Sequence, residues 1–441
     1  MSSTFLTRTA GSAVTAERKK YTISVWVKRS TVGVEHAVCS AGNGGGSEEF
    51  AIRFDSTDKL NCFHWNGSSM AGQLITNRLF RDVNAWYHIY FVYDSANSTQ
   101  ADRFMLYING ERETSFSTNT GLTQNDLSPW NVDERHQIGS NSWNNSGNGN
   151  AMFDGVMSHF YNVAGSHIAV TEFGSTDSTT GEWKINTSPT ISSYGTDGFL
   201  VLKDGNTATD QSTNSNNFTV SGTLTKTEDC PSNVFCTWNP LYRSARKDMT
   251  LTNGNTFIFE QNSGDSGVSG TIGVSSGKYY WEQIVAQVNG TNAAITGGLH
   301  TTEDWNESPT DAMAANTVGM RSNGNVWKGT TDLGNFTTAT YNGDIIGVGF
   351  DADNGSMYFW RNGTALNSGN AIITGMDMTK TWIPFGVQHG GARVTTSTNF
   401  GNGYFQTTAV SSAGTNASGI GIFEYDVPTG YTALSTKGLN L

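Results

Sequence analysis

The sequence predicts an all-β protein made of two β-sandwiches in tandem. Charged residues are only 15% of the 441 residues and Gly occurs 51 times, a composition that disfavours helices and favours short strands joined by tight turns. Aromatic residues, at 11%, supply the large buried areas that sandwich cores need. Two strand-turn-strand units, at 86–110 and 343–363, both end in a Tyr-containing strand followed by Asn-Gly, which indicates two copies of one kind of sandwich.

The hairpin at 343–363 shows the pattern most clearly. Ile346, Val348 and Phe350 alternate with small residues, so one face of this strand is expected to meet a core. Asp353-Asn354-Gly355 then turns the chain, because Asn-Gly tolerates the positive φ of tight hairpins. The returning strand, 357–360, stops at a second Asn-Gly.

Further strands are expected along the first half of the chain. Ile23, Val25 and Val27 share one face of an alternating segment. The pairs 49–54 and 60–65 are separated by a short polar turn and predict another hairpin. The remaining predicted elements are strands at 3–8 and 152–162 and one short helix within 169–183.

A polar, turn-rich segment at 204–240 is expected to connect the two domains, which we place at 1–225 and 226–441. Cys230 and Cys236 flank Pro231 within this segment, so a local disulfide is one interpretation and two free thiols the other. Cys39 and Cys62 lie in apolar surroundings and are expected to be buried small hydrophobes.

Landmarks of the first half resemble those of laminin-G/pentraxin-type concanavalin-like domains. They are Ile23-Ser24-Val25-Trp26-Val27, Trp86-Tyr87-His88, Leu106-Tyr107-Ile108-Asn109-Gly110 and Phe153-Asp154-Gly155, in family order over about residues 1 to 165. The resemblance implies a concanavalin-like jelly-roll sandwich. It also implies calcium as the one candidate cofactor, held at one end of the sandwich, for which we take Asp94, Asp133 and Asp154 as ligands.

The second half resembles the SPRY (B30.2-like) sandwich. The motifs, in family order, are Gly277-Lys278-Tyr279-Tyr280-Trp281-Glu282, 343–348, 357–363 and Trp382-Ile383-Pro384-Phe385-Gly386-Val387. With the joint Ser215-Asn216-Asn217-Phe218-Thr219-Val220, nearly the whole chain is similar to tail-fibre-like virion proteins of marine bacteriophages.

Charge and hydropathy narrow the function classes. The net charge is −12 and no basic run occurs, so no nucleic-acid partner is expected. No apolar stretch approaches membrane-spanning length, so membrane insertion is not expected, and the first residues lack the order of a signal peptide.

Motifs for catalysis are weak. Gly264-Asp265-Ser266-Gly267 resembles a serine-protease nucleophile motif, but Val268 replaces the next glycine and a simple turn explains it better. Glu303 and Glu307 flank Asp304 at a spacing that does not suit laminarinase-type glycosidases. Asp351 and Asp353 fit a hairpin turn better than a calcium loop. We therefore expect a protein that is not an enzyme.

Loop aromatics are the stronger functional signal. Trp143 beside Asn145 and Trp305 beside Asn306 place a ring next to amides, which suits sugar binding, because the ring covers C–H bonds while the amides bond hydroxyls. His389 and Arg393 lie on a Gly-rich segment and are added to this ligand-binding set. The alternative is that either Trp packs on the sandwich edge or on a neighbouring subunit.

Together these features predict a virion-surface protein, tail-fibre-like, that contacts host-surface glycan or protein and associates with other virion proteins. A homo-oligomer is expected, and a trimer is the guess that the tail-fibre resemblance suggests. The two alternatives are a capsid- or tail-attached decoration protein without host contact, and a glycan depolymerase that uses Glu303 and Glu307.

Overall fold

The fold was analysed in a computed structural model that describes residues 4–11, 13–42, 47–141, 151–203, 207–243, 249–260, 266–289, 294–301, 317–338, 343–388 and 393–440. The all-β prediction is confirmed. Within these ranges the one α-helix is the five-residue α1 (Thr15–Lys19). No helix in the described part of the chain is long and apolar enough to cross a membrane.

The chain divides into two compact units, Met1–Lys226 with Cys230–Ser232, and Thr227–Asp229 with Asn233–Leu441. The division therefore falls inside the polar segment around residues 226–233. All four cysteines are free thiols, and Cys39, Cys62 and Cys236 are buried. The local disulfide between Cys230 and Cys236 is not formed.

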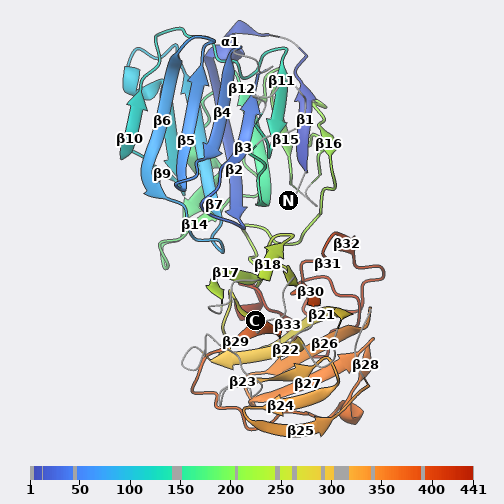
Figure 1. Ribbon diagram of the computed structural model, residues 1–441. Helices are drawn as coiled ribbons and strands as arrows, with labels where there is room; N and C mark the ends of the chain where they lie inside the picture. Colours follow the sequence, from blue (N-terminus) through green and yellow to red (C-terminus); the bar gives the residue numbers. More distant parts are fainter. Residues whose placement is uncertain are drawn as a thin grey trace. The chain divides into compact units, whose positions relative to one another are not determined.

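The first unit is a sandwich of two antiparallel sheets (Figure 1). The eight-stranded sheet has the order β10 (Phe116–Thr120), β6 (Met70–Leu79), β5 (Lys59–Trp65), β4 (Glu49–Phe54), β3 (His36–Ala41), β11 (Arg135–Ile138), β1 (Phe5–Thr9) and β16 (Thr219–Ser221). The six-stranded sheet has the order β15 (Phe199–Val201), β12 (Gly155–Ala164), β2 (Lys20–Arg29), β7 (Tyr87–Asp94), β8 (Phe104–Ile108) and β9 (Glu111–Arg112).

The core of this unit follows from strand alternation. Ile23, Val25 and Val27 of β2 are fully buried against Phe50 and Ile52 of β4, because alternate side chains of each strand point between the sheets. The predicted hairpins 49–54/60–65 and 86–94/104–108 are confirmed as β4–β5 and β7–β8.

The opposite face of the six-stranded sheet is covered by residues 165–198. This segment contains the 3-10 turn η2 (Val170–Glu172) and the hairpin β13 (Gly174–Thr176) and β14 (Trp183–Ile185). The helix predicted within 169–183 is wrong. The Asp177 carboxylate accepts the backbone N–H groups of Thr179 and Thr180, both at 2.9 Å, and so closes a turn where the helix was expected.

The Asn109-Gly110 turn after β8 holds this cover in place. Both residues have positive φ (50° and 80°), as a two-residue hairpin turn requires. A Cβ on Gly110 would lie 2.4 Å from the Trp183 ring. The indole of Trp183 in turn donates from Nε1 to His88 Nδ1 at 3.0 Å.

We therefore expect Gly110→Ala to destabilise the first unit by about 1–3 kcal/mol, through positive φ and the displaced Trp183 ring together. Gly33→Ala is the matched control, because Gly33 also has a positive φ (76°) but has open space around its Cβ position. Urea unfolding of both variants checks this. An equal loss of unfolding free energy in both variants would show that displacing the Trp183 ring does not destabilise the protein.

The second unit is also built from two facing sheets. One has the order β17 (Trp238–Arg243), β20 (Ser266–Gly270), β29 (Trp382–Gln388), β22 (Ala294–Thr301), β23 (Thr317–Arg321), β24 (Asn325–Lys328) and β25 (Thr331–Asn335). The other has the order β18 (Met249–Thr252), β19 (Phe257–Glu260), β30 (Arg393–Asn399), β21 (Lys278–Asn289), β26 (Ile345–Asp351), β27 (Ser356–Arg361) and β28 (Thr364–Ala365). The hairpin predicted at 343–363 is confirmed as β26–β27.

The chain after β30 covers the outer face of β21. It includes β31 (Tyr404–Phe405), β32 (Thr408–Ala409) and β33 (Thr432–Ala433), and β33 pairs with β21 in parallel. Tyr280 of β21 packs there against Phe423 and Val427. The Glu282 carboxylate, fully buried, accepts the backbone N–H groups of Glu424 and Tyr425, both at 2.9 Å. The remaining short turns are η1 (Gln100–Asp102), η3 (Asn367–Gly369) and η4 (Gly438–Asn440).

Candidate functional site

One end of the first unit gathers polar side chains that lack partners. Antiparallel register places the start of β4 beside the end of β5, with Glu49 opposite Trp65, and the start of β2 beside the end of β7. Helix α1 lies at this end (Figure 1). Its Arg18 guanidinium lies 3.3 Å from Glu48, the residue just before β4, which connects the two sheets there. We call this region the α1 end.

Glu49 and Trp65 are cross-strand neighbours on the outer face of the eight-stranded sheet, because Phe50 and Ile52 take the core-facing positions of β4. Glu49 is only 2% exposed, yet neither of its carboxylate oxygens accepts a hydrogen bond from the described residues. The Trp65 Nε1–H is likewise buried without an acceptor in that part of the chain. We call these two residues the Glu49–Trp65 pair.

The electrostatics of Glu49 follow from this burial. Desolvation raises the pKa of Glu49 to about 7, and the nearby Arg53 only partly opposes the rise. Arg53 is committed elsewhere, since it forms an ion pair with Glu35 at 2.5 Å and lies 4.9 Å from the centre of the Phe63 ring. The Glu49 carboxylate therefore keeps its hydrogen-bonding capacity unused.

Residues that directly follow β11 approach this pair. The Ser40 hydroxyl donates to the Ser140 carbonyl at 3.0 Å, which ties Ser140 to β3. The next residue, Asn141, approaches Glu49 closely enough to favour its ionised form, although without a hydrogen bond of normal geometry to either carboxylate oxygen. Asn141 is the last described residue before 142–150, the segment that contains Trp143 and Asn145.

Acidic groups surround Arg18 at the same end. Burial raises the pKa of Asp126 and of Glu134, and Arg18 lowers both. Asp126 also lies 3.6 Å from the buried His64, whose pKa is lowered to about 4 by desolvation. No three Asp, Glu, His or Cys side chains within the described ranges lie close enough together to hold a metal ion.

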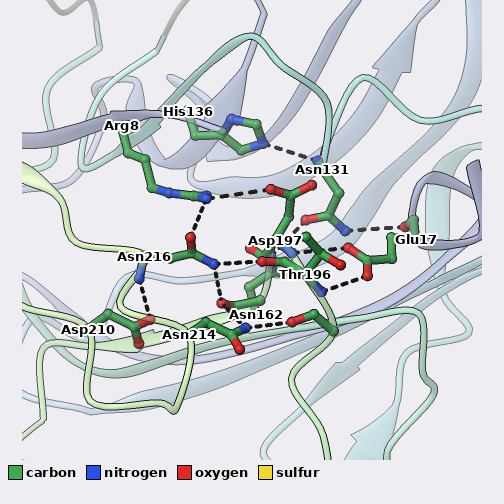
Figure 2. A network of polar contacts seen from close by, with 12 residues as sticks. Arg8, Glu17, Asn131, His136, Asn162, Thr196, Asp197, Asp210, Asn214 and Asn216 are labelled. Atoms are coloured by element: carbon green, nitrogen blue, oxygen red, sulfur yellow. Dashed lines mark hydrogen bonds and ion pairs between the residues drawn. The ribbon is translucent and has the colours of Figure 1, made fainter. Parts of the chain in front are cut away.

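A second polar cluster, here called the clamp, ties the connector to the first unit (Figure 2). Asp210 accepts the backbone N–H groups of Leu200, Ser212 and Asn216 at 2.9, 2.9 and 2.7 Å. Its oxygens are therefore occupied by donors and are not available to a ligand. The residues labelled in the figure are Arg8, Glu17, Asn131, His136, Asn162, Thr196, Asp197, Asp210, Asn214 and Asn216.

The clamp also holds the N-terminal strand and α1. Arg8 of β1 donates to Asn216 at 2.7 Å and lies 3.5 Å from Asp197. Glu17 of α1 accepts the backbone N–H groups of Thr196 and Asp197 at 2.6 and 3.0 Å. Because these groups bond one another in the interior, we assign the clamp to stability and not to ligand binding.

Two buried Ser–His pairs resemble the nucleophile and base of a hydrolase. The Ser269 hydroxyl lies 2.8 Å from His300 Nε2, and the Ser24 hydroxyl lies 2.8 Å from His88 Nε2. All four residues are at most 1% exposed, and a backbone carbonyl at 2.9 Å, not a carboxylate, orients His300 Nδ1. These pairs satisfy buried polar groups inside the sandwiches.

Most of the ligand-binding residues predicted from the sequence lie outside the described residues: Trp143, Asn145, Trp305, Asn306 and His389. Arg393 begins β30, and only its backbone is described. The last described residues before Trp305 and His389 lie at opposite ends of β29. Thr301 pairs with Trp382 at one end and Ala294 with Gln388 at the other, about 20 Å apart along the strand.

The three carboxylates proposed as calcium ligands do not form one site. Asp94 lies opposite Lys20 at one end of β2 and forms an ion pair with it at 3.1 Å. Asp154 precedes the residue opposite Arg29 at the other end of β2, about 30 Å away, and accepts a hydrogen bond from Thr31. Asp133 is exposed. The prediction that these three share an ion was wrong, because it did not account for strand direction.

Comparison with known proteins agrees with this architecture. Residues 6–168 match a family profile described as the Concanavalin A-like lectin/glucanases superfamily. This matched stretch lies within the first unit and supports its concanavalin-like, jelly-roll fold. No curated protein matches the chain.

Two solved structures are similar to part of the chain. The SPRY domain of human HERC1 has 15% identity and a TM-score of 0.32, covering 36% of this chain and 96% of that chain. The PSpry domain of TRIM65 has 13% identity and a TM-score of 0.28, covering 37% of this chain and 89% of that chain. Likenesses at this level say nothing about ligands.

Proposed function

We propose that this protein is a binding component of a bacteriophage virion, tail-fibre-like, that contacts glycan or protein on the host surface. The observation that supports it best is the Glu49–Trp65 pair, an aromatic side chain beside an unpartnered carboxylate. Sandwich folds serve enzymes, lectins and scaffolds alike, so the proposal depends on this site and not on the fold. The assignment to a phage comes from the sequence resemblance.

In this role the protein acts by binding and not by catalysis. Recognition through the Glu49–Trp65 pair at the α1 end is expected to be weak at each site. Repetition on the virion surface, alongside other virion proteins and as a homo-oligomer, would multiply that affinity because each further contact is intramolecular. A homotrimer is the assembly that we propose.

One observation favours the alternative, a decoration protein without host contact. Strand β17 is an edge strand of its sheet, and its Leu241 and Tyr242 are 58% and 38% exposed. Exposed apolar side chains on a sheet edge suit contact with another subunit. Such a contact would serve assembly in either role.

The proposal predicts that purified full-length protein blocks infection. Host cells preincubated with the protein in large excess should adsorb the phage that carries it more slowly, because the protein occupies the same receptors. Loss of binding to periodate-treated cells would indicate a glycan receptor, and loss of binding to protease-treated cells would indicate a protein receptor. Unchanged adsorption, together with no binding of fluorescent protein to untreated cells, would reject host contact and leave the decoration role.

A further inference from the structure

The unused hydrogen-bonding capacity at the α1 end requires an explanation. A carboxylate that is buried without donors costs free energy, because it loses its hydration and gains nothing in return. The other buried carboxylates in the described part of the chain have at least one partner, as Asp94 has in Lys20 and Asp197 in Arg8. Glu282 accepts four hydrogen bonds, from the backbone N–H groups of Glu424 and Tyr425 and from the side chains of Tyr280 and Asn399. Glu49 differs from it, because no described residue makes a hydrogen bond of normal geometry to its carboxylate, although the Asn141 side chain approaches it.

The charged neighbours of Glu49 do not explain its burial, because each is already paired with another group. Arg53, on the same face of β4, is held by Glu35 and by the Phe63 ring. Arg18 is held by Glu48 and by the Ser128 carbonyl, which accepts from Nε at 2.8 Å. A metal ion would need further acidic ligands, and no such group exists within the described ranges.

The two unpartnered groups are complementary to one kind of ligand. A carboxylate accepts hydrogen bonds from two hydroxyl groups at once, and the Trp65 Nε1–H donates to a third oxygen. The Trp65 ring, which is half-buried, offers an apolar surface to C–H groups. An anionic ligand is disfavoured, because both nearby guanidinium groups already pair with Glu35 and Glu48.

We propose that Glu49 and Trp65 form the base of a subsite for an uncharged sugar ring with two adjacent hydroxyl groups. The sugar hydroxyls take the place of the Asn141 side chain over the carboxylate, and the indole N–H binds a ring or hydroxyl oxygen. This inference rests on the proposed binding function and names the ligand class and the residues of that site. Glu49 is then a residue that determines specificity for vicinal hydroxyls.

The test is saturation-transfer NMR of the full-length protein at pH 8 with the methyl glycosides of glucose, galactose, mannose and N-acetylglucosamine. At least one glycoside should receive saturation from the wild-type protein. Glu49→Gln should weaken its binding about 100-fold, to below detection, since two charge-assisted hydrogen bonds are lost. Trp65→Phe, which keeps a ring but lacks Nε1–H, should weaken binding less.

Glu111→Gln is the matched control, because it removes an exposed negative charge on β9, in the other sheet, and leaves Glu35 and Arg53 in place beside the pair. It should bind the glycoside as the wild type does. Equal binding by Glu49→Gln and wild type would overturn the subsite, and so would the absence of binding by all four glycosides. If cells still adsorb the protein in that case, the subsite fails while the proposed function stands. If the protein binds a glycoside but does not bind cells, the subsite stands and the proposed host contact fails.

Discussion

Replacing Glu49 by Gln is expected to stabilise the first unit at pH 8 by about 3 kcal/mol. The pKa of Glu49 is raised by burial from 4.5 to about 7. Each unit of pKa difference between the folded and unfolded states corresponds to about 1.4 kcal/mol, so ionising Glu49 costs the folded state roughly that total. Gln has nearly the same shape and carries no charge to desolvate.

The pH dependence of this effect has a definite sign. The folded pKa lies above the unfolded pKa, so the folded state holds the proton more tightly. The stability of the wild type should fall as pH rises from about 4.5 to about 7 and then level off. The gain from Glu49→Gln should therefore be small at pH 4.5 and reach its full size at pH 8.

Hydrogen–deuterium exchange of the β4 and β5 amides, compared between variant and wild type at each pH, measures this effect within the intact chain. Glu111→Gln serves as the control, since Glu111 is exposed on β9 in the other sheet and a surface charge there contributes little to stability. A variant that is less stable than the wild type at pH 8 would mean that Glu49 has a partner in the folded protein.

This prediction and the sugar subsite support each other. A residue that lowers the stability of the free protein and is needed for binding is typical of functional sites, where stability is lost in favour of activity. The single change Glu49→Gln should therefore give a protein that is more stable and binds less. Substitution of a purely structural residue gives a different result, because the protein then binds less only as a consequence of being less stable.

The second large effect is expected at Glu282. Changing Glu282 to Ala should cost the second unit about 3–5 kcal/mol, because four donors lose their acceptor inside the protein. Two of these donors are backbone N–H groups of residues 424 and 425, which fix the C-terminal cover on β21. The cover should loosen before the sheets do.

Limited proteolysis of the full chain, followed by mass spectrometry, checks this result. Cleavage should appear first between residues 400 and 431 in Glu282→Ala. Asp426→Asn is a control in the same segment, because the Asp426 carboxylate is exposed and, among the described residues, accepts hydrogen bonds from the neighbouring Thr415. If both variants resist protease as the wild type does, Glu282 does not hold the cover.

Strand alternation and turn residues were sufficient to predict several hairpins, but not the order of strands in the sheets. The hairpins β4–β5, β7–β8 and β26–β27 lie where the period of two and the turn residues placed them. The segment 169–183 was mistaken for a helix, because local composition does not show that Asp177 will cap a turn or that Trp183 will pack on His88.

The candidate site was harder to predict. Glu49 and Arg53 both occupy polar positions of an alternating strand, and the sequence does not show that one is paired and the other is not. The predicted hairpin contained the useful signal, since its register places Glu49 opposite Trp65. The predicted calcium site was wrong for a similar reason. Asp94 and Asp154 were chosen from their positions in sequence motifs, which carry no information about strand direction.

The clamp has a consequence for how the protein is made. Strand β1, near the beginning of the chain, pairs with β16, and Arg8 bonds Asn216 more than 200 residues later. When only the first two hundred residues have left the ribosome, the edge of β1 has no β16 to pair with. The Arg8 guanidinium likewise lacks its Asn216 partner. Such distant contacts slow folding, so the nascent sandwich waits for residues 210–221 to emerge.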